Sequence, residues 1–465
     1  MVNDMTKGKP MKLILAFCIP MLIGNIIQQL YSMVDSVVVG RYIGVDAFAG
    51  VSSTGTLTFL VIGFVLGLTS GFSIKVSQSF GAGDYKEMRR YAVNSLYLSG
   101  AFAILLTILT VAFTRPLLRV MQTPENIFNY AYDYIIILFA GISVTILYNI
   151  LASILRAVGD SKTPLIFLGI AAFINIVLDL LFVIVFGMGV KGVGYATIIA
   201  QVISAILCII YIKKRYFILH FERDELKIDI RKCKDLVSVG VPMALQYSIT
   251  AIGTIILQSA VNTLGSDAVA AVGAAIRVQS IAILPMETLG LTMATYAGQN
   301  LGAKKYDRIR YGVNRSLILS VAYSLVIYLV MAFFGGSISQ LFIKKEEVEI
   351  IGDIVRFLRV SGAFYPTIAI LFIIRNVLQG LGYSAVTMLA GVSELLARGA
   401  IAIVFVGSFG FNAVIFAGPI AWIAADIILI ITYIVKQNEL KRMCMEPTND
   451  VSYVKQADSN CIRTD

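Results

Sequence analysis

The segment QSFGAGDYKEMRRYAVN at Gln78–Asn94 returns about 221 residues later as GQNLGAKKYDRIRYGVN at Gly298–Asn314. Further pairs of segments keep nearly the same offset: Pro20-Met21 with Pro242-Met243, IGVDAFAGV from Ile43 with LGSDAVAAV from Leu264, and LRAVGDSK from Leu155 with LQGLGYSA from Leu378. A repeat of this length predicts two copies of one fold in the chain.

The composition is that of a membrane protein. The 465-residue chain is 58% hydrophobic and only 14% charged, with a mean hydropathy of +0.83. Soluble domains carry roughly 25% charged residues, so this chain has too few to cover a water-facing surface. Its first apolar block is too long for the apolar region of a cleavable signal peptide, so we expect that block to be the first membrane span.

The apolar blocks predict an all-α membrane protein with twelve transmembrane helices, because a helix needs about 20 residues to cross a bilayer. We expect the spans at about 12–39, 52–79, 91–114, 129–155, 163–186, 193–212, 236–262, 274–299, 312–338, 349–379, 386–407 and 413–435.

The distribution of Lys and Arg predicts the orientation. Placing both termini in the cytoplasm leaves few basic residues outside: Arg41, Arg115, Arg119, Lys191, Lys344 and Lys345. This positive-inside pattern predicts a multi-pass protein of the cytoplasmic (inner) membrane with both termini cytoplasmic. It also accounts for the net charge of +10 without a nucleic-acid partner.

The charged segment 213–235 divides the chain. It separates an N-lobe at 1–212 from a C-lobe at 236–436, and a cytoplasmic C-terminal tail follows at 437–465. Six spans per half make both copies insert with the same orientation, so the repeat is parallel and its axis lies along the membrane normal. Two such lobes enclose a cleft that rocking exposes to each side in turn, which favours a transporter.

Inserting a carboxylate into the membrane costs about 2.5–3.5 kcal/mol of free energy at the middle of a helix. Each carboxylate inside a predicted span therefore indicates a structural or functional role. Asp35 lies well inside the first span, one turn after Tyr31. Asn175 and Asp179 are four residues apart in the fifth span and therefore share a helix face. No Lys or Arg in these two spans neutralises the acids.

Two nearby carboxylates without a cation cannot both ionise cheaply at low dielectric. One must bind a proton, or the pair must bind a metal ion such as sodium. Thr197 in the sixth span and Asn149 in the fourth offer further oxygen ligands of the kind hard cations prefer. The alternative is that Asp35 and Asp179 cap helix ends or pair with buried donors.

The second half carries a different set of charges. Glu394 and Arg398, four residues apart, suggest a structural salt bridge, and Asp426 is interpreted as structural. Glu287 either contacts substrate or pairs with Arg277 or Arg375. Lys75 and Arg156 lie near cytoplasmic helix ends, where we expect their side chains to extend to the membrane surface.

Pro20 falls inside the first span, where a missing backbone hydrogen bond predicts a kink. The kink is either static or coupled to protonation of Asp35. Tyr31, Tyr148 and Met33 are candidate contacts for flat lipophilic cations through cation–π and sulfur interactions.

The order, spacing and duplication of these segments resemble those of the multidrug and toxic compound extrusion (MATE) family, most closely the bacterial branch that includes the MepA-type and DinF-type pumps. The resemblance covers about residues 10–436. It rests on the Asn175–Asp179 pair and on IP…D…VGRYIGVDAFAGV, GFSIKVSQSFGAGD, YNILASILRAVGDSKTP and GQNLGAKKYDRIR.

The resemblance implies a V-shaped twelve-helix fold that exports organic cations in exchange for protons or sodium ions. It implies a coupling-cation site, with sodium as one candidate occupant, at Asp35, Asn175, Asp179 and Thr197, with Asn149 and Tyr31 nearby, and bending of the first helix at Pro20. Another branch of the family has a sodium site built on acids of the seventh and tenth spans. Here the seventh span has none, and the tenth has only Glu349 and Asp353 at its outer end, so we expect no C-lobe site of that kind.

We therefore expect a cation-coupled antiporter, with no cofactor beyond the coupling ion H⁺ or Na⁺. Its expected partners are small cationic or lipophilic substrates and membrane lipid, and we expect a monomer. A flippase for lipid-linked oligosaccharides is the alternative, although it would need a ring of intramembrane cations. An enzyme is disfavoured because the single histidine, His220, has no HExxH or GxSxG motif around it, and a scaffold or sensor because no soluble signalling domain is present.

Overall fold

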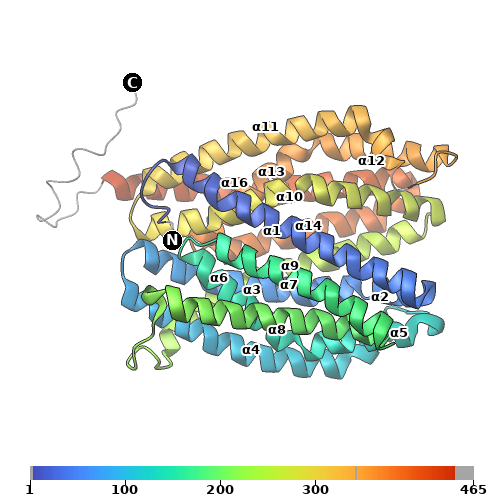
Figure 1. Ribbon diagram of the computed structural model, residues 1–465. Coiled ribbons are helices and arrows are strands. Elements are labelled where there is room, and N and C mark those ends of the chain that lie inside the picture. The colour runs from blue at the N-terminus through green and yellow to red at the C-terminus, as the bar shows by residue number, and fades with distance from the viewer. Residues whose placement is uncertain (1–3, 341–342, 446–465) are drawn as a thin grey trace, which may run out of the picture.

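The computed structural model describes residues 4–340 and 343–445, and its regular elements are all helices within those ranges (Figure 1). The first half comprises α1 (Pro10–Val38), η1 (Val39–Ile43), α2 (Val45–Ser53), α3 (Gly55–Gly81), α4 (Tyr85–Val120), α5 (Glu125–Ala140), α6 (Ile142–Ala157), α7 (Lys162–Leu180), η2 (Leu181–Val185) and α8 (Val190–Arg215). After η3 (Phe217–Leu219), the second half comprises α9 (Ile230–Asn262), α10 (Ser266–Gly302), α11 (Tyr306–Ser339), α12 (Val348–Ala363), α13 (Tyr365–Gly380), α14 (Ser384–Ala400), η4 (Ile401–Phe405), α15 (Val406–Phe409) and α16 (Phe411–Met445).

Ten helices of the described chain are long and apolar enough to cross a membrane, and two bent pairs raise that number to twelve. The bent pairs are α5–α6 and α12–α13, and their helices meet at 50° and 51°. Each predicted span therefore coincides with a helix or a bent pair. Most helices extend beyond the predicted span, because charged residues continue the helix past the apolar block.

The backbone repeats between the two halves. The bent pair is the fourth span in each half, and a π-helical turn directly follows the α-helix of the fifth, η2 after α7 and η4 after α14. Gly44 and Gly265 have φ of 130° and 98°, and Gly189 and Gly410 have φ of 58° and 56°. These left-handed values suit glycine, which explains why the repeated turns keep it. The duplication read from the sequence is therefore visible in the geometry of the turns.

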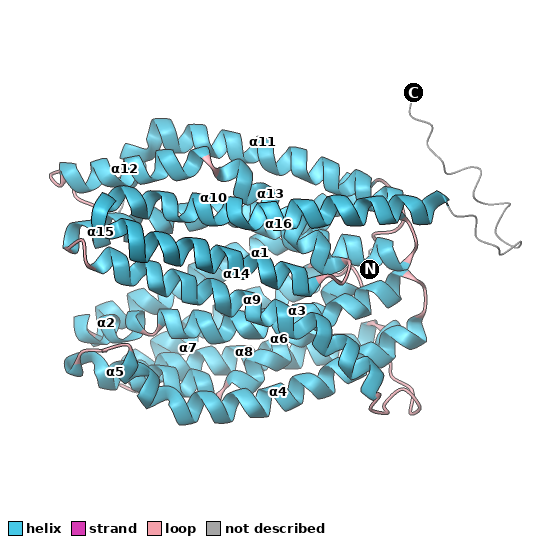
Figure 2. Cartoon of the chain, turned by 180° about the vertical axis from the view of Figure 1, so that it is seen from behind, coloured by secondary structure: helices cyan, strands magenta, loops and turns pink. Residues whose placement is uncertain are grey.

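The bundle has two distinguishable ends. α1 begins and α16 ends at the same end, together with the loop 82–84 and the connector; we call this the terminal end (Figure 1). Seen from behind, the helices of the first half other than α1 lie in the lower part of the bundle, and α1 lies among the helices of the second half in the upper part (Figure 2). α1 packs against α7 of its own half and against α10 of the other half.

Glycines let the two lobes approach closely. A Cβ on Gly71 would lie 2.5 Å from the Cα of Gly240, and a Cβ on Gly67 would lie 2.6 Å from the backbone oxygen of Met243. α3 and α9 therefore pack backbone to backbone over several turns, as small residues four apart permit inside membranes.

The chain start closes the terminal end. Residues 4–9, which we call the N-terminal strap, lie in the seam between the lobes. Buried Met5 donates its backbone N–H to Gln299 Oε1 at 2.9 Å, and its carbonyl accepts from Asn300 Nδ2 at 3.3 Å. Lys305 Nζ donates to the Thr6 carbonyl at 2.8 Å. Most hydrogen bonds between the lobes lie at this end. Toward the opposite end, the described residues show none beyond Asn25 Nδ2 to Thr288 Oγ1 at 3.0 Å.

The predicted connector 213–235 is partly helical. α8 continues to Arg215 and α9 begins at Ile230, so the segment between these two helices is 216–229. Arg89 of α4 donates to both carboxylate oxygens of Glu225 at 2.7 Å, and the Glu225 side chain is fully buried. The connector is therefore held against α4 by an ion pair. The predicted tail from 437 begins inside α16, and residues 446–465 lie outside the described chain.

Candidate functional site

A cavity of about 560 Å³ lies between the lobes. Helices α1, α3, α6, α7 and α8 of the first lobe line most of it, and α9, α10 and α13 of the second lobe complete it. Because both lobes contribute walls, a rocking motion of one lobe against the other would change the access to this cavity.

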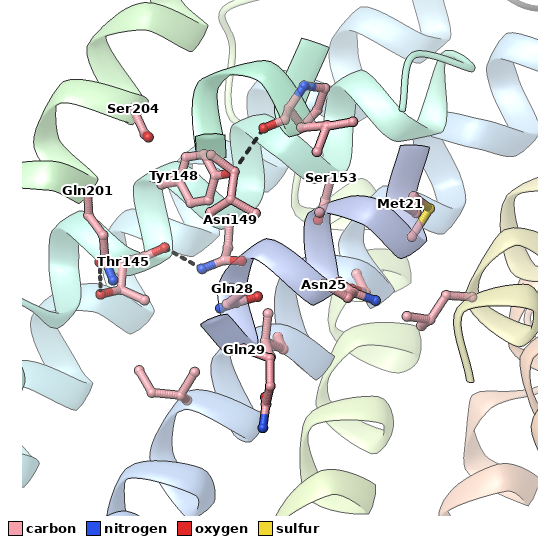
Figure 3. Close-up of a pocket in the computed structure, with 18 of the residues that line it drawn as sticks. Met21, Asn25, Gln28, Gln29, Thr145, Tyr148, Asn149, Ser153, Gln201 and Ser204 are labelled. Atoms are coloured by element: carbon pink, nitrogen blue, oxygen red, sulfur yellow. Dashed lines mark hydrogen bonds between the residues drawn. The ribbon is translucent and has the colours of Figure 1, made fainter. Parts of the chain in front are cut away.

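The wall from the first lobe is polar (Figure 3). Thr145 Oγ1 donates to Gln201 Oε1 at 2.5 Å, and Asn149 Nδ2 donates to the Thr145 carbonyl at 2.8 Å. Tyr148 donates its hydroxyl to the Pro164 carbonyl at 3.4 Å. These bonds tie α6 to α7 and α8, and they leave the amide oxygen of Asn149 free of a protein donor in the described chain.

Asp35 and Asp179 face each other across the contact between α1 and α7. Asp35 is 8% exposed and lines the cavity, whereas Asp179 is fully buried behind it. Their carboxyl groups are close enough for one to donate a hydrogen bond to the other, provided that a proton is present. As two carboxylates they have no donor between them, and both oxygens of Asp179 then lack a partner.

Asn175 lies one turn before Asp179 on the same face of α7. Its side chain is 2% exposed and lines the cavity, and both its amide atoms lack a hydrogen-bond partner. Buried polar atoms without a partner are rare in native structures and need an explanation. Here the orphaned atoms are those of the predicted cation site, and no Lys or Arg of the described chain forms an ion pair with either acid.

Thr197 and Asn149, the two residues expected to offer further oxygen ligands, also line this cavity. The Thr197 hydroxyl donates to the Val193 carbonyl of its own helix at 3.0 Å, so its oxygen lone pairs remain available. Within the described residues there is no cluster of three His, Cys, Asp or Glu side chains. The donor set is instead two carboxylates with amide and hydroxyl oxygens, which suits a proton or a hard monovalent cation.

Three of the four predicted substrate contacts line the cavity. They are Tyr31, Tyr148 and Glu287. The prediction for Met33 is wrong, because its side chain is 57% exposed and lies outside the cavity. Residues two apart on a helix point about 200° apart, so Met33 cannot share the face of Asp35. Pro20 lines the cavity within α1, which the structure shows as one helix through that residue.

The predicted ion pair between Glu394 and Arg398 is also wrong, because Glu394 pairs with Arg375 of α13. Arg398 instead lies against Gly253 of α9, where its Nη1 would be 3.3 Å from an added Cβ. Asp426 is buried within electrostatic reach of Arg375 and Glu394.

Glu287 has no ion-pair partner among the described residues. Neither partner considered from the sequence forms an ion pair with it: Arg375 pairs with Glu394, although its charge lies within electrostatic reach of Glu287, and Arg277 is exposed without an ion pair. Glu287 lines the cavity from α10, so its carboxylate is available to a ligand.

Arg156 does not extend to the membrane surface as expected. It lines the cavity, and its Nη2 donates to Ser153 Oγ at 2.9 Å. Lys75, the other residue for which we expected that orientation, is half-buried on α3 and does not line the cavity.

Sequence reasoning named Asn149 but missed polar lining residues on the same helix whose spacing could have revealed them. Thr145 and Ser153 lie four residues before and after Asn149 on α6, so the three share one helix face. Tyr134 of α5 is within electrostatic reach of both Asp35 and Asp179, and no pattern in its own helix marks it.

A two-lobed bundle of membrane-spanning helices, with a polar cavity between the lobes and an unpaired acid pair at its wall, has the architecture of a membrane transporter. The chain belongs to the MatE family, whose model matches residues 20–181 and 242–417. This result confirms the resemblance inferred from the sequence motifs.

Proteins similar in sequence to this chain match it over most of its length. It is 32% identical over 338 residues to the probable multidrug resistance protein YoeA of Bacillus subtilis (strain 168), which covers 71% of this chain and 73% of that relative. It is 31% identical over 386 residues to the probable multidrug resistance protein YpnP of the same organism, with coverage of 82% and 84%. A crystal structure of MATE in the bent conformation matches with a TM-score of 0.88 at 23% identity, over 94% of this chain and 98% of that one. The predicted fold class is confirmed.

Proposed function

We propose that this protein is an antiporter that exports organic cations and drugs across the cytoplasmic membrane in exchange for protons or sodium ions. The observation that carries the proposal is the contact between Asp35 and Asp179, two buried carboxyl groups without a cationic partner in the described chain. The relatives named as multidrug resistance proteins support the class of substrate.

The acid pair supplies a reason to bind a cation. Two like charges at hydrogen-bonding distance repel strongly at low dielectric, so the empty, doubly ionised pair is unfavourable. A single proton between Asp35 and Asp179 would relieve the repulsion and satisfy orphaned oxygen atoms. A sodium ion would do the same with Asn175, Asn149 and Thr197 as further ligands.

The pair is placed to couple ion binding to the position of α1. Asp35 is on α1 and Asp179 on α7, and α1 also packs against α10 of the other lobe. Loading a cation draws the two carboxyl groups together and unloading pushes them apart, so the packing of α1 between the lobes responds to the ion. Bending at Pro20 is one route for that response.

Alternating access follows from the closed terminal end. The N-terminal strap and its hydrogen bonds join the lobes there, which corresponds to an outward-facing state if the termini are cytoplasmic. Turning inward requires these bonds to break. Each coupling cation that enters gains about 2.3 kcal/mol per 100 mV of membrane potential, and each exported monovalent cation costs a similar amount. Electrogenic exchange of such a substrate would therefore use two coupling ions.

The substrate is proposed to bind in the cavity. Glu287 supplies a carboxylate for an organic cation, and Tyr31, Tyr148 and Tyr247 supply aromatic faces. A lipid-linked pyrophosphate would need several cations, whereas Arg156 is the one basic side chain among the described lining residues. We propose that the protein works as a monomer, with small cationic or lipophilic molecules and membrane lipid as its partners.

The test is ion-driven export of ethidium by purified protein in liposomes, with a proton gradient and a sodium gradient imposed separately. We expect one gradient to drive export, and Asp35→Asn and Asp179→Asn each to reduce the rate at least about tenfold, since each removes one member of the acid pair. Asp426→Asn is the matched control, because Asp426 is a buried acid outside the cavity. Export that keeps its rate and ion dependence in both variants would refute the coupling site.

A further inference from the structure

Arg156 is an unpaired cation inside the cavity. It is the one basic side chain among the described residues that line the cavity, and no carboxylate of the described chain lies within ion-pair distance of it. A guanidinium has five N–H donors, and a single bond to Ser153 Oγ is formed here. The remaining donors lie in a wall whose other charged or ionisable group, Asp35, forms no ion pair with Arg156.

The neighbours of Arg156 do not neutralise it. The side chains within electrostatic reach of the Arg156 guanidinium are Tyr148, Tyr247 and Cys208. All three are neutral in their ordinary protonation state at pH 7. Tyr148 and Tyr247 both line the cavity. A charged group that is partly removed from water and has no partner costs free energy. A charge at Arg156 is therefore tolerated only if a ligand or water in the cavity contacts it.

A charge of opposite sign lies on the other lobe. Glu287 lines the same cavity from α10 and also has no ion-pair partner in the described chain. Tyr247 is within electrostatic reach of both Glu287 and Arg156, so the two charges border one region of the cavity. They nevertheless do not pair with each other. The cavity therefore has the acid Glu287 on its C-lobe wall and the single basic side chain Arg156 on its N-lobe wall, where Asp35 also lies.

We infer that the cavity is built for zwitterionic organic molecules, whose oxyanion binds Arg156 and whose cation binds Glu287. This inference rests on the proposed export of organic cations and narrows its substrate class. The two oxygens of a carboxylate or phosphate group accept two parallel N–H···O bonds from a guanidinium, an arrangement that a lysine cannot reproduce. A ligand that contacts both lobes at once would also hold them in one relative position, so binding and rocking become linked.

The experiment compares two probes that differ in one charge. A fluoroquinolone with a free carboxylate and a basic amine is the zwitterion, and its methyl ester is the matched cation. Equilibrium binding of each is measured on the full-length protein in detergent, and export of each in liposomes. The variants are Arg156→Gln, Arg156→Lys and, as a matched control, Lys75→Gln, which removes a half-buried cation that does not line the cavity.

We expect the wild type to bind the zwitterion more tightly than the ester. Arg156→Gln should weaken binding of the zwitterion about tenfold and change binding of the ester by less than about twofold, because a tenfold loss corresponds to one charge-assisted contact. Arg156→Lys should recover part of that loss, since it restores the charge without the planar pair of donors. Lys75→Gln should leave both probes unaffected.

Three outcomes would overturn the inference: equal loss of both probes in Arg156→Gln, no loss of either, or tighter binding of the ester than of the zwitterion by the wild type. A short-chain anionic phospholipid is added as a competitor. Displacement of the zwitterion by that lipid, abolished in Arg156→Gln, would assign the site to a lipid headgroup instead. If neither ion gradient drives export but Arg156→Gln still weakens binding of the zwitterion more than of the ester, the proposed antiport is rejected. The assignment of Arg156 as the anion-binding residue would still hold.

Discussion

Gln299 of α10 donates its side-chain amide to the carbonyl of Ala157 at the end of α6, at a distance of 2.8 Å. The oxygen of the same side chain accepts the backbone N–H of Met5 at 2.9 Å. One buried amide therefore joins the C-lobe to the N-lobe and to the N-terminal strap. Its removal tests whether this end of the bundle is held closed by specific bonds or by packing alone.

Gln299→Ala should shift the protein toward a state open at the terminal end. The variant leaves two buried backbone groups without partners, at a cost of about 1–3 kcal/mol each. The measurement is the distance between spin labels at Tyr85 of α4 and Arg310 of α11, both exposed, in a cysteine-free background. Gln258→Ala, which removes an exposed amide bond to Asn262, should leave the distance distribution unchanged.

Gly302→Ala should be incompatible with the closed terminal end. A Cβ on Gly302 would overlap the backbone oxygen of Gln78, and one on Gly81 would overlap that of Gln299. Overpacking of this kind costs typically 1–3 kcal/mol, so the ends of α3 and α10 must separate. Hydrogen–deuterium exchange over residues 294–302 should become faster. Gly100→Ala is the control, because nothing lies within 4 Å of its added Cβ, and equal exchange in both variants would contradict the prediction.

Glu225→Gln should destabilise the connector. The Arg89 guanidinium, which donates to both oxygens of Glu225, holds the pKa of that carboxyl below its usual 4.5. Breaking a buried ion pair costs about 3–5 kcal/mol; we expect on the order of 2–3 kcal/mol because the Arg89 side chain is 16% exposed. Proteolysis within residues 216–229 should speed up, whereas Glu222→Gln, at an exposed neighbour, should have little effect.

The same pair predicts a pH dependence. Since the pKa of Glu225 is depressed in the folded protein, its contribution is fully present above its unfolded pKa of about 4.5 and is lost as the pH falls through the folded value. Resistance of the connector to proteolysis by an acid-active protease should therefore decrease on acidification below that range. Glu225→Gln should abolish this part of the dependence, and an unchanged acid profile in the variant would assign it to other groups.

Glu394→Gln should destabilise the C-lobe more than Arg398→Gln. Glu394 forms the buried ion pair with Arg375, so its loss leaves an uncompensated guanidinium, at about 3–5 kcal/mol. Arg398 has no ion pair within 4.0 Å in the described chain. Thermal unfolding in detergent measures the difference. The ranking predicted from the sequence, in which both residues belong to one pair, requires equal losses.

The sequence was sufficient for the fold because the information was redundant. The apolar blocks predicted twelve spans, the Lys and Arg asymmetry predicted their orientation, and the duplicated segments predicted two copies of one fold. The bends within the fourth spans were missed. One lies at Gly141, where a Cβ would overlap Ile198, and the other lies next to Pro366, which has no backbone N–H to donate. Both bends depend on one residue within an otherwise continuous apolar block.

The candidate site was predictable residue by residue but not as a set. A carboxylate within an apolar span is unusual enough to be noticed in the sequence, so Asp35 and Asp179 could be named as candidate site residues. Their contact could not, because no local pattern specifies that α1 packs against α7. The sequence suggested Arg375 as an ion-pair partner for Glu287, but Arg375 forms its ion pair with Glu394 of the adjacent helix. Such choices depend on which side chains three-dimensional packing brings together, and sequence spacing informs only about neighbours on one helix.

The N-terminal strap has a consequence for how the protein is made. Met5 is synthesised first, but its partner Gln299 follows 294 residues later. At about 5–20 residues per second, the ribosome needs roughly 15–60 s to produce that partner. During this time the first lobe can insert and pack while its leading segment waits undocked. Docking of Met5 is thus a late event in biogenesis, and it can occur only in chains whose second half has reached α10.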